Sequence, residues 1–184
     1  MAEKTLIDIK AYSLSNDDIN EILEPDTRIL SYPAFQSMTS IDEAFDSLGR
    51  CVFLFLTEGP GIGHWLCMFK RENNTIEYFD SYGEKPEAQR NWISQDQLDD
   101  LDESEPYLMN LLRESRCKIF YNTVKYQKKK DDYNSCGRWV VARLICKDMS
   151  DKQFYNLIQS QMKEKGIKEM DEWVSLFTYE FLGK

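Results

Sequence analysis

The sequence predicts an α+β domain, on three observations. Apolar and aromatic residues form three short strand-like runs between residues 50 and 80, separated by turn-forming residues. The predicted order along the chain is helix, strand, helix, three strands, helix, strand and then helices, which is typical of α+β proteins. The 184 residues are 42% hydrophobic, which is enough to bury the core of one domain. We therefore predict a single domain over residues 1–184, with a central, mostly antiparallel sheet surrounded by helices.

The first predicted elements are a helix, a strand and a second helix. In "SLSNDDINEILEP", Ser15 can cap a helix that has acidic residues in its first turn and an apolar stripe, and Pro25 ends it. A short strand follows at residues 28–32. The segment "TSIDEAFDSLG", residues 39–49, has a cap residue at its start and a glycine at its end, which predicts a second helix.

Three strands follow. "RCVFLFL", residues 50–56, is a continuous apolar run that fits a buried central strand. "HWLCMFK" and "TIEYFD", residues 64–70 and 75–80, are rich in aromatic and apolar residues and flank the turn-forming "RENN". We predict that these last two strands pair as a hairpin.

The second half of the chain is predicted to be mainly helical. Residues 84–102 are polar and acidic, "EPYLMNLLRES" predicts a helix that opens near Pro106, and "KIFYNTVKYQ", residues 118–127, predicts another strand. Three helices complete the chain, at residues 136–149, 151–165 and 171–182. The first of them is apolar nearly all round, so we expect it to be buried in the core.

Composition excludes several classes of protein. Five cysteines, with no CxxC pair, argue against a disulfide framework and against a zinc site, so no metal is expected. A net charge of −9 disfavours a nucleic-acid platform. No apolar run reaches the length of a membrane span and the start of the chain lacks a signal-peptide core, so we expect an intracellular protein without membrane contacts. We interpret four cysteines and three tryptophans as packed core residues: Cys51, Cys67, Cys117, Cys146, Trp92, Trp139 and Trp173.

The stretch "YNSCGRWVVARL" places Cys136 at the first turn of a predicted helix. A helix N-terminus lowers the pKa of a thiol, and the glycine that follows lets backbone amides approach a developing oxyanion. Taken alone, a cysteine before an apolar run is more often a buried core thiol. Because the chain has a single histidine, any Cys-His chemistry must use His64.

His64 and Asp80 come at the ends of predicted strands. If these strands form an antiparallel pair, the two side chains lie at the same open end, where the carboxylate can orient the imidazole. Gln127, nine residues before Cys136, can donate its amide to an oxyanion beside the Cys136 backbone N–H. Asp80 alone would be an ordinary turn residue, and it is the joint order that indicates catalysis.

These motifs resemble a known family. "GHW", "YFDSYG", a glutamine and "NSCG" follow one another as in the adenovirus-type maturation proteases and the related proteases that cleave ubiquitin-like modifiers such as SUMO. The resemblance covers residues 63–144 and extends faintly to "LSNDDI". The ending "CGRW" looks more like the proteases of large DNA viruses, virophages and Polinton-type elements than like the cellular SUMO proteases.

The resemblance implies a papain-like cysteine protease fold and a role for each matching residue. It implies His64 as general base and acid, Asp80 as its orienting partner, Cys136 as nucleophile and Gln127 as oxyanion donor. Trp65 matches the family tryptophan that lines a narrow channel, which implies substrates with glycine near the scissile bond.

The chain departs from the family in two ways. The interval between Gln127 and Cys136 is longer than is usual in the cellular branch, so Gln127 can sit differently. Adenovirus-type enzymes have basic surfaces and use DNA and a peptide as activators, whereas this chain is acidic and has one basic run, at residues 128–130. We therefore expect no cofactor and do not extend a nucleic-acid or peptide activator to this chain.

The sequence thus predicts a cysteine endopeptidase whose polypeptide substrates are viral or element-encoded capsid and structural precursors. It would act in the host cytoplasm or viral factory, or be packaged in the virion. Three alternatives remain open at this point. They are a protease that acts on ubiquitin-like modifiers, an acetyltransferase like those of bacterial effectors, and a catalytically silent binding or assembly module.

Overall fold

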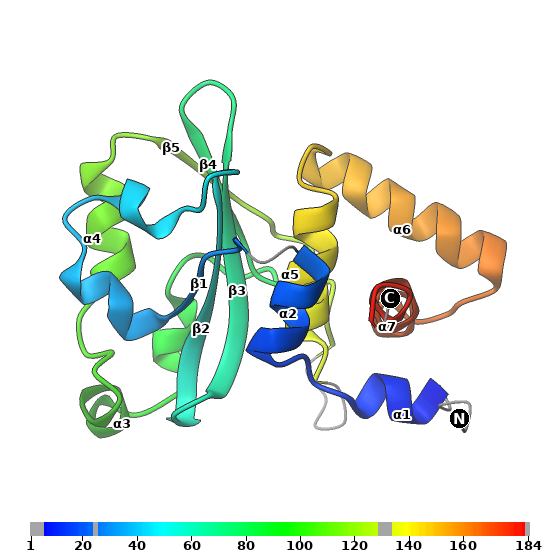
Figure 1. Ribbon diagram of the computed structural model, residues 1–184, viewed down its shortest axis with the longest axis horizontal. Coiled ribbons are helices and arrows are strands. Elements are labelled where there is room, and N and C mark those ends of the chain that lie inside the picture. Colours follow the sequence, from blue (N-terminus) through cyan, green and yellow to red (C-terminus); the bar gives the residue numbers. More distant parts are fainter. Residues whose placement is uncertain (1–5, 24–25, 129–133, 183–184) are drawn as a thin grey trace.

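The computed structural model describes residues 6–23, 26–128 and 134–182, and its five-stranded sheet stands between two groups of helices (Figure 1). The strands, in sheet order, are β1 (Ile29–Ser31), β2 (Arg50–Gly59), β3 (Ile62–Arg71), β4 (Thr75–Phe79) and β5 (Lys118–Tyr121). The α-helices are α1 (Leu6–Ala11), α2 (Asn16–Leu23), α3 (Gln95–Asp100), α4 (Tyr107–Glu114), α5 (Cys136–Ile145), α6 (Asp151–Lys165) and α7 (Met170–Tyr179). Short 3-10 helices lie at Tyr32–Ser37, Ile41–Ala44 and Ala88–Asn91.

The predicted α+β class is confirmed. The three central strands, β2 to β4, are antiparallel, and β3 and β4 form the predicted hairpin. Its turn uses Asn73 and Asn74, both at positive φ, where asparagine is tolerated better than most residues. The two edge strands run parallel to their neighbours, β1 to β2 and β5 to β4.

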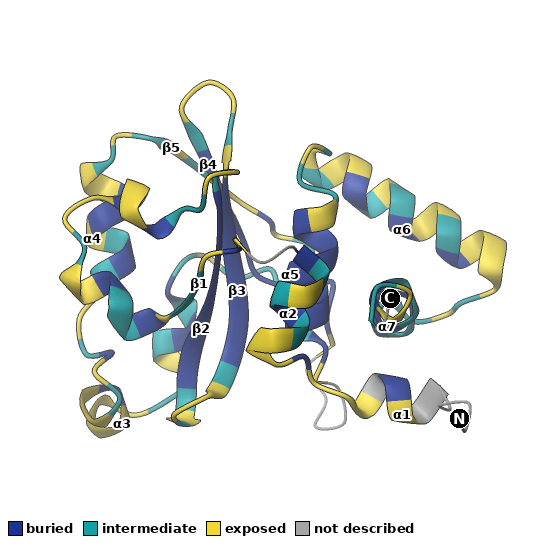
Figure 2. Ribbon diagram, in the orientation of Figure 1, coloured by how far each residue is buried: buried dark blue, intermediate teal, exposed yellow. Residues whose placement is uncertain are grey.

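The helix that begins at Cys136 is buried against one face of the sheet. Every residue of α5 from Gly137 to Leu144 is buried, which confirms the prediction from its all-round apolar pattern (Figure 2). Trp139 and Trp173 stack in this core, as predicted, at a ring distance of 5.9 Å. A second core fills the other face, between the sheet and α4.

The predicted helix at residues 39–49 is wrong. Only Ile41–Ala44 form a single 3-10 turn, and Phe45 is already extended. The Asp46 carboxylate accepts hydrogen bonds from the backbone amides of Leu48 and Arg50 at 2.9 and 2.8 Å, which turns the chain directly into β2. This local hydrogen bonding by an aspartate competes with continuation of a helix.

The predicted strand at residues 118–127 ends at Tyr121. Asn122 is fully buried and donates its amide to the Asp80 carbonyl at 2.7 Å, so the chain leaves the sheet there. Gln127 is consequently on a loop rather than at a strand end.

Smaller differences concern element ends. The acidic stretch at residues 84–102 contains α3, whose capping box uses Ser94 and Gln97 and which the sequence analysis did not predict, and α1 was not predicted either. Helix α5 ends at Ile145 rather than Met149, whereas α6 has the predicted bounds. Pro25, predicted to end the first helix, lies outside the described residues.

The described cysteines are all free, and Cys51 and Cys67 are fully buried in strands, as predicted. Among the described residues, no helix combines the length and apolar character needed to cross a membrane, and no group of three or more His, Cys, Asp or Glu side chains could hold a metal ion.

Two glycines of the β2–β3 hairpin give a matched test of how closely its two strands pack. A Cβ atom on Gly63 would lie 1.9 Å from the Phe55 carbonyl oxygen, whereas one on Gly59 would meet nothing within 4 Å. We expect Gly63→Ala to lower the free energy of unfolding by about 3 kcal/mol or more, because the strands beside His64 must separate. Urea unfolding measures it, with Gly59→Ala as the control. Equal stability of the two variants would contradict this packing.

Candidate active site

The three residues predicted to act together do meet at the open end of the β3–β4 hairpin. His64 lies near the start of β3, Asp80 directly follows β4, and Cys136 is the first residue of α5. The imidazole Nε2 of His64 and Oδ1 of Asp80 are 2.8 Å apart, and both side chains are buried. Because Nε2 faces Asp80, the other ring nitrogen is left for the Cys136 thiol, and the thiol and the imidazole are close enough to shift each other's pKa.

The environment shifts the pKa values of the thiol and the imidazole in opposite directions. Burial alone would lower the pKa of His64, but its hydrogen bonds to Asp80 and Cys136, and the charges of both, raise it to about 9. Burial alone would raise the pKa of Cys136, but the hydrogen bond and the charge of His64, with the backbone amides of Trp65 and Gly137, lower it. These opposite shifts favour the charged form of each group relative to an isolated thiol and imidazole.

Asp80 is held in place by residues that the sequence analysis missed. Gln89 donates its amide to Oδ2 of Asp80 at 2.8 Å, and the Tyr82 backbone amide donates to Oδ1 at 2.9 Å. Asn122 binds the main chain of Asp80 twice, accepting from its N–H at 3.0 Å and donating to its carbonyl at 2.7 Å. With these partners the carboxylate is fixed toward His64.

Two aromatic rings enclose the imidazole. Tyr82 stacks on His64 at a ring distance of 4.7 Å and an interplanar angle of 11°, and Trp92 meets it edge-on at 5.2 Å. The interpretation of Trp92 as a core residue is therefore wrong, because it is half-buried beside the candidate base. Both rings restrict the orientation of the imidazole and its exposure to water.

Gln127 is joined to the turn that follows Asp80. Its side-chain carbonyl oxygen accepts from the Ser81 hydroxyl at 2.7 Å, and its backbone N–H donates to the Ser81 carbonyl at 2.9 Å. Gly83 completes this turn at φ 69°, where a Cβ would lie 2.8 Å from the Thr123 and Val124 carbonyl oxygens. These contacts orient the side-chain amide of Gln127, a residue that is 4% exposed.

A cavity of about 520 Å³ opens beside the thiol. Trp65 and Cys136 line it, together with Gly61 to Gly63 of the hairpin and Ser13 to Asp17 of the N-terminal segment. A Cβ on Gly137 would lie 3.1 Å from the Trp65 ring and 3.3 Å from Cβ of Leu14, so α5 packs closely against both residues beside the cavity.

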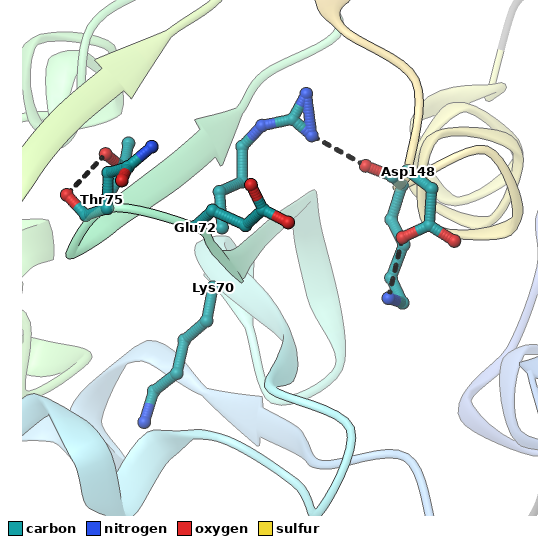
Figure 3. A pocket seen from close by; sticks show the side chains of 7 residues that line it. Lys70, Glu72, Thr75 and Asp148 are labelled. Atoms are coloured by element: carbon teal, nitrogen blue, oxygen red, sulfur yellow. Dashed lines mark hydrogen bonds and ion pairs between the residues drawn. The ribbon is translucent and has the colours of Figure 1, made fainter.

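A second cavity, of about 630 Å³, lies at the other end of β3 (Figure 3). Its lining includes Lys70, Glu72, Thr75 and Asp148 but no thiol and no imidazole. Two of its charged groups are paired, Lys70 with Asp42 at 2.6 Å and Asp148 with Lys147 at 3.1 Å. The smaller cavity is therefore the candidate active site.

Comparison with known proteins gives one clear relative. The uncharacterised protein V9 of Sputnik virophage is 36% identical over 166 residues, which cover 90% of this chain and 94% of V9. No protein-family model matches the chain.

Two solved structures are similar at low TM-scores. The central domain of the uncharacterised Lpg1148 protein of Legionella pneumophila is 14% identical, with a TM-score of 0.38, over 92% of this chain and 99% of that domain. The ASFV pS273R protease is 16% identical, with a TM-score of 0.44, over 95% of this chain and 70% of the protease. Because these scores are low, the case for a catalytic site comes from this chain's own residues.

The shifted pKa values predict a thiol that reacts at neutral pH. Because the pKa of Cys136 is lowered from the ordinary thiol value and that of His64 is raised to about 9, alkylation of Cys136 by iodoacetamide at pH 7 should be faster than that of the other four cysteines. In His64→Ala, the hydrogen bond and charge of the imidazole no longer oppose burial and only the Trp65 and Gly137 amides do, so the rate at pH 7 should fall by about ten-fold or more. Peptide mass spectrometry measures it, with the other four cysteines as internal controls. A rate independent of His64 would exclude the ion pair.

Proposed function

The chain belongs to the family of the Sputnik virophage protein V9, and on that premise we propose that it is a cysteine endopeptidase formed as one domain. The observation that carries the proposal is the set of buried His64, buried Asp80 and partly exposed Cys136, with a raised imidazole pKa and a lowered thiol pKa. Such opposed shifts at one cavity are characteristic of a catalytic nucleophile and its base. The relationship to a virophage protein agrees with the resemblance of "CGRW" to virophage sequences, and the protease activity of ASFV pS273R is of the same class.

In the proposed reaction, the Cys136 thiolate attacks the carbonyl carbon of the scissile peptide bond. A sulfur–carbon bond forms while the carbonyl π electrons move to oxygen. His64 then gives its proton to the departing amine as the carbon–nitrogen bond breaks. A water molecule attacks the thioester and transfers a proton to His64, and the carbon–sulfur bond breaks to restore the thiolate.

The remaining residues stabilise charge in this sequence of steps. Asp80 holds the imidazole ring and balances the charge of its protonated form. The Cys136 backbone N–H is free of intrahelical bonding because it opens α5, and it can donate to the oxyanion beside the Gln127 amide. A single lost donor of this kind typically costs about 10²- to 10³-fold in kcat.

We propose that Trp65 and Leu14, which line the cavity beside Cys136, form a narrow passage to the thiol that admits small residues, so glycine-containing sequences fit best. We propose that the substrates are capsid or other structural precursors made in a viral factory, in keeping with the virophage relative. No DNA or peptide activator is included, since Lys128, the described part of the basic run, pairs with Glu169, and residues 129 and 130 lie outside the described residues.

The alternatives are less well supported. No feature among the described residues favours a ubiquitin-like modifier or acetyl-CoA as substrate. A silent binding module would not require a buried imidazole and carboxylate, hydrogen-bonded to each other, beside a thiol of lowered pKa. The endopeptidase is therefore the function that these side chains support best.

Fluorogenic peptide amides test the proposal. We expect peptides that end in Gly-Gly or Ala-Gly to be cleaved and peptides that end in Leu-Leu to resist, because the passage admits small residues. Cys136→Ala should lower kcat by about 10⁴-fold or more, while Cys146→Ala should leave it unchanged. Turnover that survives in Cys136→Ala would falsify the proposed mechanism.

A propargylated SUMO or ubiquitin probe separates the two protease hypotheses. Such a probe labels a cysteine only where the modifier itself docks. We expect no labelling of Cys136 by either probe under conditions in which the small peptides are cleaved. Rapid labelling that requires Cys136 would instead assign the enzyme to ubiquitin-like modifiers.

A further inference from the structure

Asp171 is a buried carboxylate that the proposed mechanism does not use. It lies in the first turn of α7 and is 1% exposed. Three donors from other parts of the chain converge on it. Oδ1 accepts from the Ser135 hydroxyl at 2.6 Å and from the Trp139 indole N–H at 3.0 Å, and Oδ2 accepts from the Lys128 backbone N–H at 3.0 Å.

The partners of Asp171 flank the two proposed oxyanion donors. Lys128 directly follows Gln127, and Ser135 directly precedes Cys136. Residues 129–133, which connect them, lie outside the described part of the chain. Oδ2 of Asp171 therefore binds the backbone next to Gln127, and Oδ1 binds Ser135 and Trp139 at the start of α5.

The hydrogen bonds to Asp171 hold its three donor groups in fixed positions. A buried carboxylate requires donors, and bonds from neutral donors to a charged acceptor are stronger than those between neutral groups. Helix α7 itself is anchored, because Trp173 stacks on Trp139 and Ser175 donates its hydroxyl to the Asp171 carbonyl at 2.7 Å. A second link joins the Lys128 ammonium group to Glu169, at the N-cap of α7.

We infer that Asp171 is a positioning residue that sets the distance between the Gln127 amide and the Cys136 N–H. The inference rests on the proposed function. Asp171 touches neither the thiol nor the imidazole in any contact found, and it acts on the oxyanion through Lys128 and Ser135. Helix α7, distant along the sequence from the other site residues, is thereby part of the catalytic apparatus.

A positioning role and a purely structural role predict different kinetics. The Cys136–His64 pair depends on contacts at the hairpin end and not on Asp171. Loss of Asp171 should therefore displace the oxyanion donors while the thiolate stays reactive. A variant that merely unfolds would lose both properties together.

The experiment compares Asp171→Asn with wild-type protein on a Gly-Gly fluorogenic peptide. We expect kcat to fall by about 10- to 100-fold with KM little changed, because a misplacement near 1 Å has a cost of this size. Iodoacetamide alkylation of Cys136 at pH 7 should stay within about two-fold of wild type, since the ion pair is retained. Asp46→Asn is the matched control, because the Asp46 carboxylate likewise accepts hydrogen bonds from the backbone, at Leu48 and Arg50, but lies far from the site, and its loss should leave kcat unchanged.

Ser135→Ala keeps the inference testable if Asp171→Asn does not fold. It removes one donor to Asp171 and should lower kcat less than Asp171→Asn does. The double variant should be no slower than Asp171→Asn alone, because both changes act on one contact. A wild-type kcat in both single variants, or a parallel loss of kcat and alkylation in folded protein, would overturn the positioning role. Absence of Cys136-dependent cleavage by the wild-type protein would instead overturn the proposed function, and the inference with it.

Discussion

The buried hydrogen bond between His64 and Asp80 is the contact on which the site depends. Burial alone would lower the pKa of a histidine that is 4% exposed, and Asp80 is one of the two groups, with Cys136, that raise it to about 9 instead. The imidazolium in turn lowers the pKa of the Cys136 thiol against the opposing effect of burial. The ring and the sulfur thus shift each other's pKa, and the fixed Asp80 carboxylate adds to the shift of the ring.

The fold supplies that rigidity by placing the site where several elements end. The β3–β4 hairpin brings His64 and Asp80 together, and α5 brings its first residue to the same point. Loops then add the polar partners, with Gln89 and Asn122 on Asp80 and Ser81 on Gln127. Each of these groups is buried and each has a partner, which favours one arrangement over many.

The sequence predicted the central strands and the meeting of His64, Asp80 and Cys136, because strand alternation and a hairpin turn are local signals. It did not predict the partners of these residues. Gln89 is nine residues from Asp80, Asn122 is 42 and Asp171 is 36 from Ser135, and no periodic pattern relates residues at such separations. These contacts depend on how the loops pack, which tertiary structure decides.

The wrong elements have a related cause. Residues 39–49 have helix-like composition, yet the Asp46 side chain binds the backbone ahead of it and ends the turn. The strand predicted at residues 118–127 has a suitable composition throughout, yet it ends at Tyr121 because the Asn122 side chain binds the Asp80 carbonyl. In both places, a polar side chain that binds the backbone overrides the helix or strand propensity of the segment.

One further contact relates the cavity beside Cys136 to helix α5. Two residues after Cys136, the buried Arg138 guanidinium donates to the Ile9 carbonyl at 3.0 Å and to the Tyr12 carbonyl at 3.2 Å. The N-terminal segment is thus held on α5, and Leu14 lies against Gly137 at the edge of the cavity. Because α5 carries both the thiol and the arginine that holds this wall, the width of the passage and the position of the sulfur are set by one rigid element. A displacement of α5 would therefore alter reactivity and substrate fit together.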